Sequence, residues 1–376
     1  DASSRFGADK RWAPFWSAGL GWNLHNEHFM EGVDWLQQFK IRGSYGLTGS
    51  QNYDPYQAIT TYEYLPGERY HYAVGAIVMA MGNRDLRWQR TWQQNYGVDL
   101  TLWKKRLDFS ADYYIKTSKD VLTSVTLAPS LGFSSYMDNL GEVENRGYEL
   151  SLRATLIRDQ ARKIFWSMNG SLIHNENKLL KISNALKAYN ETQDKEADAN
   201  QSDYSANDWI NKAVNRPRVR YIEGASMNSI WVNRSLGIDP ATGNELFADR
   251  NGGIVSDWSS ANYVIGGCTD PKVEGTFGTN FTWKGLSLNM TFRYRIGGQM
   301  YNQTLVDKVQ DIDPRYNVDE RAFTDRWKNP GDLSRYLAIR QTTQTYNSER
   351  FVERLNELWL SSATISYEFQ AKFLKR

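Results

Sequence analysis

Apolar and polar residues alternate with a period of two along most of this chain. Between Trp16 and Leu24 the even-numbered positions are apolar, and the odd-numbered positions are small or polar. Successive side chains of a β-strand point to opposite faces, so this spacing predicts strands with one apolar and one polar face. We expect about nine strands of roughly 10 to 15 residues, longer than the usual 5 or 6 residues of globular sheets. The clearest stretches are 12–24, 39–48, 88–102, 107–116, 148–156, 164–172, 286–296 and 359–369.

The connections between these stretches alternate between short and long. The short ones are residues 104–106, 159–162 and 284–285. The long polar ones are residues 49–87, 118–146, 175–272 and 297–354. Outer-membrane barrels have short periplasmic turns and long extracellular loops. The sequence therefore predicts an all-β fold, in which the chain forms the wall of an antiparallel transmembrane β-barrel with long extracellular loops.

The alternative all-β interpretation is a soluble β-sandwich or propeller. Sandwiches and propellers have shorter strands, and their connections do not alternate so regularly in length. An internal repeat, which a propeller requires, is not visible in the sequence. The alternation alone favours the barrel and leaves the sandwich as the alternative.

Composition narrows the functional classes. The chain has 376 residues, 40% of them hydrophobic, but no apolar run approaches the roughly 20 residues of a membrane helix. A helical membrane protein is therefore excluded. The net charge of +2 gives no reason to invoke nucleic acid. The 14 Trp and 22 Tyr fit either the aromatic girdles of a barrel or flat platforms for sugars.

We assign the whole chain, residues 1–376, to one partial β-barrel domain. Residues 175–272 are predicted to be a large extracellular loop insertion, and residues 297–354 a second long extracellular loop. A loop of that first length needs structure of its own. We expect a helix within 179–199 and a hairpin with turns at 239–243 and 249–253.

Five polar and aromatic residues of the long loops are candidates for substrate binding. Aromatic rings offer stacking faces for sugars, and Asn or Arg side chains can bond hydroxyl or carboxylate groups. The alternative is that these rings pack loop against loop, and it is favoured because buried rings more often pack than bind. The candidates are Trp231, Asn233, Arg234, Trp258 and Tyr301.

Candidate metal sites in the sequence are weak. Oxygen ligands in an acidic loop with Asp311, Asp313 and Asp319 could hold calcium, but the twelve-residue signature is incomplete. Residues 249–257 form a similar acidic loop. The spacing of His25 and His28 arises easily by chance, so we predict no transition-metal site and no required cofactor.

Motifs of hydrolytic or nucleotide-dependent catalysis are not recognisable in the sequence. No Gly-x-Ser-x-Gly elbow, His-Glu-x-x-His motif or P-loop occurs. His71 and His174 belong to no recognisable sequence motif, and the single cysteine, Cys268, receives no role. We therefore expect that the protein is not an enzyme.

Short motifs along the whole chain resemble the C-terminal barrel region of SusC/RagA-type TonB-linked transporters. The segment 40–49, Lys-Ile-Arg-Gly-Ser-Tyr-Gly-Leu-Thr-Gly, is similar to one strand of that family, and 139–149 is similar to another. Each fragment alone is weak, but their order agrees with the family. The other fragments are 4–7, 11–12, 21–22, 27–30, 83, 86–88, 95–99, 112–114, 120–122, 237–240, 325–327, 330–332 and 350–353.

The resemblance implies a plug-containing barrel of the Gram-negative outer membrane that imports oligosaccharides or peptides. It also implies a SusD-like surface lipoprotein as a lid and TonB as the energy-coupling partner. Because the family's plug and TonB box lie upstream and further strands follow, we expect this chain to be a part of such a protein. An open sheet would leave edge amides unpaired in lipid. A passive porin and a surface lectin or adhesin are the alternative functions.

Overall fold

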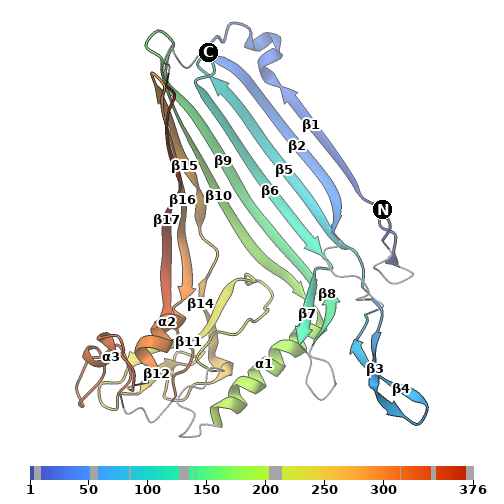
Figure 1. Cartoon of the computed structure of the whole chain (residues 1–376), viewed down its shortest axis with the longest axis vertical. Helices are drawn as coiled ribbons and strands as arrows, with labels where there is room; N and C mark the ends of the chain where they lie inside the picture. Colours follow the sequence, from blue (N-terminus) through green and yellow to red (C-terminus); the bar gives the residue numbers. More distant parts are fainter. Residues whose placement is uncertain are drawn as a thin grey trace. The chain divides into compact units, whose positions relative to one another are not determined.

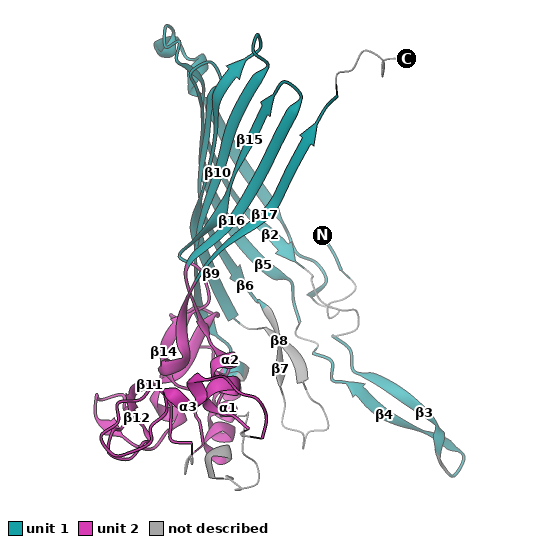
Figure 2. Ribbon diagram, turned by 60° about the vertical axis from the view of Figure 1, so that its left-hand side comes forward, with its two compact units in different colours: residues 1–186, 272–296, 356–376 teal, residues 187–271, 297–355 magenta. Residues whose placement is uncertain are grey.

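The computed structural model describes two compact units (Figure 2). The first, here the sheet unit, comprises residues 1–186, 272–296 and 356–376, and the second, here the loop unit, comprises 187–271 and 297–355. The described residues are 1–3, 10–50, 58–83, 86–126, 135–139, 141–202, 214–313, 315–339 and 344–369. The family-like motif at 4–7 lies outside them.

One nine-stranded sheet dominates the sheet unit (Figure 1). Its strands follow chain order, and neighbours from β1 to β16 pair antiparallel. The nine strands confirm the predicted number and the all-β antiparallel fold. They are Trp16–Asn23 (β1), Leu36–Ser50 (β2), Gln89–Leu102 (β5), Leu107–Lys119 (β6), Gly141–Asp159 (β9), Ile164–Ile182 (β10), Val273–Trp283 (β15), Leu286–Tyr301 (β16) and Val352–Tyr367 (β17).

Tight turns set the register at one end of the sheet. Lys284 and Gly285 join β15 to β16 with φ of 49° and 94°. Positive φ at both central residues is what a type I′ two-residue hairpin turn requires, and the twist of that turn matches the twist of the strands. Lys104 and Lys105, between β5 and β6, are also left-handed. We call this end of the sheet the turn side and the other end the loop side.

Several strand ends differ from the prediction. β9 begins at Gly141 rather than 148, and β10 continues to Ile182 rather than ending near 172. Their loop-side ends are polar on both faces, as in Asn175 to Lys178, so the alternation disappears where the strands continue. β1 is shorter than predicted at both ends: it begins at Trp16 rather than at 12, and it ends at Asn23, after which Leu24 is buried in a 3₁₀ turn.

Smaller elements of the sheet unit lie in its connections. Two hairpins, β3–β4 and β7–β8, form at the loop side. Their bounds are Thr61–Tyr70 (β3), Ala73–Ala80 (β4), Leu122–Thr126 (β7) and Ser135–Asn139 (β8), and 3₁₀ turns span Leu24–Asn26 (η2) and His28–Met30 (η3).

The loop unit has its own four-stranded sheet, ordered β13-β12-β11-β14. The hairpin turns predicted at 239–243 and 249–253 are confirmed between β11, β12 and β13. The predicted helix exists but runs later, as α1. Elements leading into or within this unit are Asn184–Ser202 (α1), Ser229–Ile238 (β11), Glu245–Ala248 (β12), Ile254–Val255 (β13), Ser260–Asn262 (η5), Tyr263–Cys268 (β14), Gln303–Leu305 (α2), Val306–Gln310 (η6, π-helical), Arg321–Thr324 (α3) and Glu349–Phe351 (η7).

Segments from both long loops share the hydrophobic interior of the loop unit. Trp231, Phe247 and Trp258 form one cluster, and Tyr346 from the second segment packs against it. The predicted segments 175–272 and 297–354 thus fold largely together, and their extracellular placement stays a prediction. Among the described residues, every helix is too short or too polar to cross a membrane.

Candidate functional site

The register of the large sheet sorts its side chains onto two faces. Cross-strand partners point to the same face. Trp22 of β1 pairs with Ile41, Ile41 with Val98, Val98 with Ala111, and Ala111 with Leu150. One face therefore carries a continuous apolar row across five strands.

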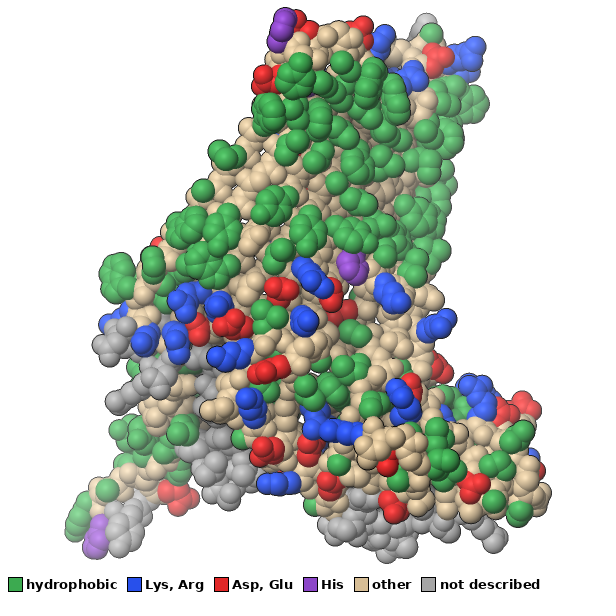
Figure 3. Space-filling view, turned by 180° about the vertical axis from the view of Figure 1, so that it is seen from behind, with side chains coloured by type: hydrophobic (Ala, Val, Ile, Leu, Met, Phe, Trp, Pro, Cys, Tyr) green, Lys and Arg blue, Asp and Glu red, His purple; other side chains and the backbone are tan. Residues whose placement is uncertain are grey.

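This apolar face is open in the sheet unit. Leu20 is 87% exposed and Trp22 is 52% exposed, and Figure 3 shows hydrophobic side chains gathered over the strands. A sandwich would bury the same residues against a second sheet. Because this apolar face is exposed and no second sheet covers it in the described sheet unit, the sandwich alternative is wrong.

Aromatic residues border the apolar face at the loop side. The Trp92 ring stacks on Tyr45 at 5.7 Å and meets Trp16 edge-on at 6.1 Å. Trp92 and Leu102 lie on one face of β5, ten residues apart. At about 3.4 Å per residue and a tilt of about 40°, that is roughly 26 Å, close to the apolar band of about 25 Å in outer-membrane barrels.

The opposite face is polar and carries a charge network on β2, β5 and β6. Arg42 lies 2.6 Å from Asp112 and 3.1 Å from Asp99. The Ser110 hydroxyl donates to Asp99 at 2.8 Å. These side chains are only partly exposed, which makes their pairing more effective than that of freely solvated ions.

A second network occupies the polar face on the last three strands. Glu274 lies 3.4 Å from Arg295 and 3.6 Å from Arg293, and Arg295 also lies 3.6 Å from Glu357. The polar face therefore carries ion pairs both among its early strands and among its last three strands, as expected for a wall that faces a wet lumen.

β17 departs from the predicted alternation. The sequence places Trp359 on the apolar face, but its ring lies 6.0 Å below the guanidinium of Arg293 on the polar face. Leu358 and Leu360, which alternate with it, are 63% and 53% exposed. Because this strand has apolar residues at both odd-numbered and even-numbered positions, the alternation alone assigned Trp359 to the wrong face.

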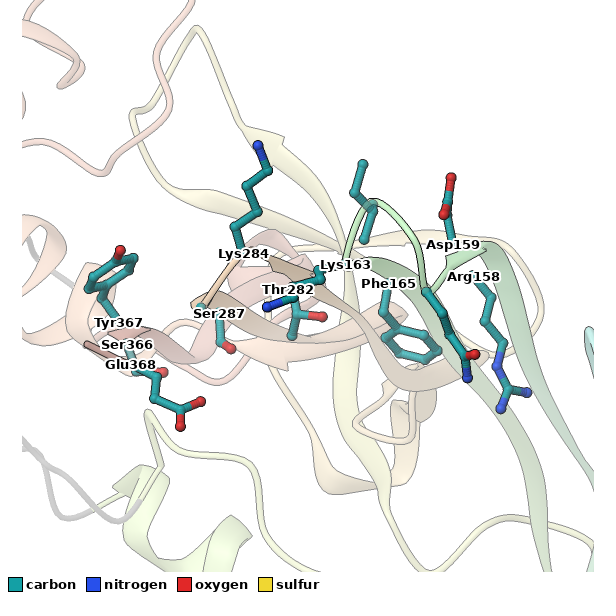
Figure 4. A pocket seen from close by; sticks show the side chains of 13 residues that line it. Arg158, Asp159, Lys163, Phe165, Thr282, Lys284, Ser287, Ser366, Tyr367 and Glu368 are labelled. Carbon is teal, nitrogen blue, oxygen red and sulfur yellow. The ribbon is translucent and has the colours of Figure 1, made fainter. Parts of the chain in front are cut away.

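Shallow hollows along the polar face offer hydrogen-bonding groups. One of about 310 Å³ is lined by Arg42, Asp112, Tyr114, Lys116 and Glu149, among others. Another, of about 730 Å³, lies at the turn side and is shown in Figure 4 with Lys163, Lys284, Tyr367 and Glu368 around it. These surfaces suit contacts with polar matter in a lumen rather than with lipid.

Two predicted substrate residues are interior residues of the loop unit. Trp231 is 6% exposed and Trp258 is 1% exposed. The Trp258 ring stacks on Tyr346 at 5.1 Å, and its Nε1 donates to the carbonyl of Asn347 at 3.2 Å. Their burial favours the packing interpretation stated above.

The other three candidates divide between interior and surface. The Asn233 side chain donates to the Ser259 carbonyl at 3.0 Å, and the Tyr301 hydroxyl donates to the Asn215 carbonyl at 2.9 Å. Both bonds hold the fold of the loop unit. The Arg234 side chain is 60% exposed, 3.6 Å from Glu349, and is the accessible member of the set.

The three calcium candidates bond to different partners. Asp311 is buried, accepts hydrogen bonds from Thr345 and Asn215, and has a pKa raised by burial. Asp313 pairs with Arg315 at 2.6 Å. Asp319 pairs with Arg321 at 2.8 Å, and the hydrogen bonds from Arg321 lower the pKa of Asp319 to about 2.

Other candidate ligands also have local partners. Asp249 accepts backbone hydrogen bonds from Asn251 and Gly253, which closes the predicted turn. His25 meets the backbone of Phe39, and His28 pairs with Glu31. Within the described residues, no three His, Cys, Asp or Glu side chains gather as a metal site.

Sequence reasoning missed the organising role of Arg326. This residue is 5% exposed, and its guanidinium donates to the backbone carbonyls of Val309, Gln310, Ala322 and Leu337. Burial lowers the pKa of Arg326. The signal present in the sequence was its place in the family-like motif 325–327, but the carbonyls it bonds are visible only in the structure.

Residues 1–305 match the family model described as TonB dependent receptor-like, beta-barrel. This chain belongs to that family. It is a family of outer-membrane receptors and not of enzymes, and the predicted resemblance and barrel-wall fold are confirmed.

Curated relatives of the family cover nearly the whole chain. TonB-dependent receptor P39 of Formosa agariphila is 28% identical over 406 residues, which is 100% of this chain and 38% of the relative. TonB-dependent receptor SusC of Bacteroides thetaiotaomicron is 26% identical over 98% of this chain and 35% of its own length. The chain thus spans a little over a third of these relatives.

Solved structures show the same fold. A structure of the RagAB peptide transporter aligns with a TM-score of 0.77 and 22% identity, over 97% of this chain and 38% of that chain. The RagAB peptide importer in an open-open state aligns with a TM-score of 0.73, again at 22% identity.

Proposed function

We propose that this chain is part of a TonB-dependent importer of oligosaccharides or peptides in the Gram-negative outer membrane. The observation that supports this proposal is that one large sheet has an exposed apolar face, with an apolar band roughly 26 Å high, and an opposite face that carries ion pairs. In this proposal the long loops are extracellular and the short turns periplasmic.

Completion of the barrel by other segments follows from the sheet edges. β1 and β17 end the strand order, so each has one neighbour among the described strands. Unpaired backbone groups cost several kcal/mol each in hydrocarbon. The remaining wall, a plug that fills the lumen and a TonB contact would come from the rest of the complete protein.

The names of the relatives support the cargo class and the partner. One relative is named TonB-dependent receptor SusC, and the structural neighbours are named as the RagAB peptide transporter or importer. We extend this to a SusD-like lipoprotein as the lid over the loops. Arg234 is the accessible candidate for contact with cargo, whereas the buried Trp231 and Trp258 would shape the loop unit.

Energy-dependent uptake distinguishes this function from a passive porin. A strain that produces the complete protein and its lipoprotein is given labelled oligosaccharides and, separately, labelled peptides. We expect uptake of one class, lost to background when TonB is deleted and strongly reduced without the lipoprotein. Uptake that continues unchanged without TonB would show a passive pore and contradict the proposal.

A further inference from the structure

A band of charged residues lies on the lipid-facing side of the sheet, just beyond its loop-side aromatic row. Tyr113 pairs with Tyr148, and Tyr148 with His174. Two residues further toward the loops, about 7 Å along the strands, Arg146 pairs with Glu176. Figure 3 shows Lys, Arg, Asp and Glu side chains directly beside the hydrophobic surface. The charged band comprises Lys119, Glu142, Glu144, Arg146, Glu176, Lys178 and Lys181.

A β-bulge places two lysines of this band on the same face. Lys178 and Lys181 are three residues apart, so in a regular strand they would point to opposite faces. The register shifts between Leu179 and Lys181, so that Lys178 pairs with Glu144 and Lys181 with Glu142. Glu142 and Glu144 share a face, and bulges re-aim side chains in this way. Both lysines therefore point toward the lipid-facing side.

These two lysines are the cations of the band that lack an ionic partner. Lys119 lies 3.3 Å from Glu142, and Arg146 lies 2.7 Å from Glu176. In the part of the chain that the structure describes, no carboxylate lies within 4.0 Å of Lys178 or Lys181, although Glu144 is opposite Lys178. Both are exposed, and an ammonium group can donate up to three hydrogen bonds.

We propose that the charged band binds the phosphate groups of a phosphorylated glycolipid in the outer leaflet. An aromatic row marks the depth of the lipid headgroups, and the lysines project just outside it. A flexible Lys stem can follow the apolar surface while its ammonium reaches a phosphate. The assignment rests on the proposed function, because that function places the loop side of the sheet in the outer leaflet.

The proposal is tested by comparing the lipid binding of two variants, each with two lysines replaced by glutamine. Complete protein in detergent is titrated with bisphosphorylated lipid A, with dephosphorylated lipid A and with inorganic phosphate, and binding is followed by native mass spectrometry. The test variant combines Lys178→Gln with Lys181→Gln. The control combines Lys104→Gln with Lys105→Gln, two exposed lysines of a turn-side hairpin.

The test variant is expected to bind bisphosphorylated lipid A about 30-fold more weakly, since each lysine near a membrane surface contributes about 1 kcal/mol. The control should stay within about twofold of the parent protein, and the parent should prefer the phosphorylated lipid. Equal binding by the test variant, no preference for phosphate on the lipid, or displacement by inorganic phosphate would each overturn the proposal. A loss confined to the control variant would instead reverse the orientation and count against the proposed function.

Discussion

Replacing Leu150 by Arg is expected to destabilise the assembled barrel by about 2–4 kcal/mol. Leu150 lies in the central apolar row of β9, where its partners are Ala111 and Leu172. An arginine there would place a guanidinium at the middle of the hydrocarbon. Urea unfolding of the complete protein in lipid vesicles, followed by heat-modifiable gel mobility, measures this cost.

Ser151→Arg provides the matched control, because it introduces the same side chain one residue further along the same strand. Ser151 is exposed on the polar face and pairs with Ser110 and Ser171. Arginine is compatible with a wet surface, so we expect a change within about 0.5 kcal/mol. Equal costs for the two substitutions would mean that the faces do not differ in their solvent.

Replacing Arg326 by Ala is expected to destabilise the loop unit by about 3 kcal/mol or more. Several buried carbonyls, including those of Val309, Ala322 and Leu337, would lose their donor, and each unsatisfied buried group costs about 1–3 kcal/mol. Hydrogen exchange measured by mass spectrometry should show faster exchange across residues 306–338, with the large sheet unchanged.

Two further variants separate this effect from loss of charge. Arg326→Lys keeps the charge but not the planar fork of donors, so it should lie between the parent and the alanine variant. Arg321→Ala removes an arginine that pairs with Asp319 at the surface, where water screens the ion pair, so we expect little change in stability. Similar exchange in the Arg321 and Arg326 alanine variants would contradict the role assigned to the buried guanidinium.

The large sheet was predictable because a half-buried strand repeats every two residues. The alternation around Tyr96 and Leu100 predicts both the strand and its two faces, and the register agrees. The prediction failed where that contrast is missing. At Asn175 to Lys178 both faces are polar, and in β17 apolar residues such as Leu358 and Trp359 occupy adjacent positions.

The loop unit was less predictable because its contacts join residues that are distant in sequence. Trp258 and Tyr346 stack although 88 positions separate them, and a count of aromatic rings does not distinguish such packing from a sugar platform. The guanidinium of Arg326 likewise donates to the carbonyl of Val309, which lies 17 positions earlier in the sequence. Arg234, by contrast, stays a predicted contact with cargo, and its role is a proposal.

Spin labels along β9 test most directly whether the sheet separates lipid from a wet lumen. Single cysteines are introduced at positions 148–154 of the complete protein in bilayers, with Cys268 replaced by Ser. Labels at Leu150, Leu152 and Ala154 should collide mainly with oxygen, and labels at Ser151 and Arg153 mainly with a water-soluble nickel reagent. Equal accessibility at neighbouring positions would contradict a lipid-facing sheet and the transport function built on it.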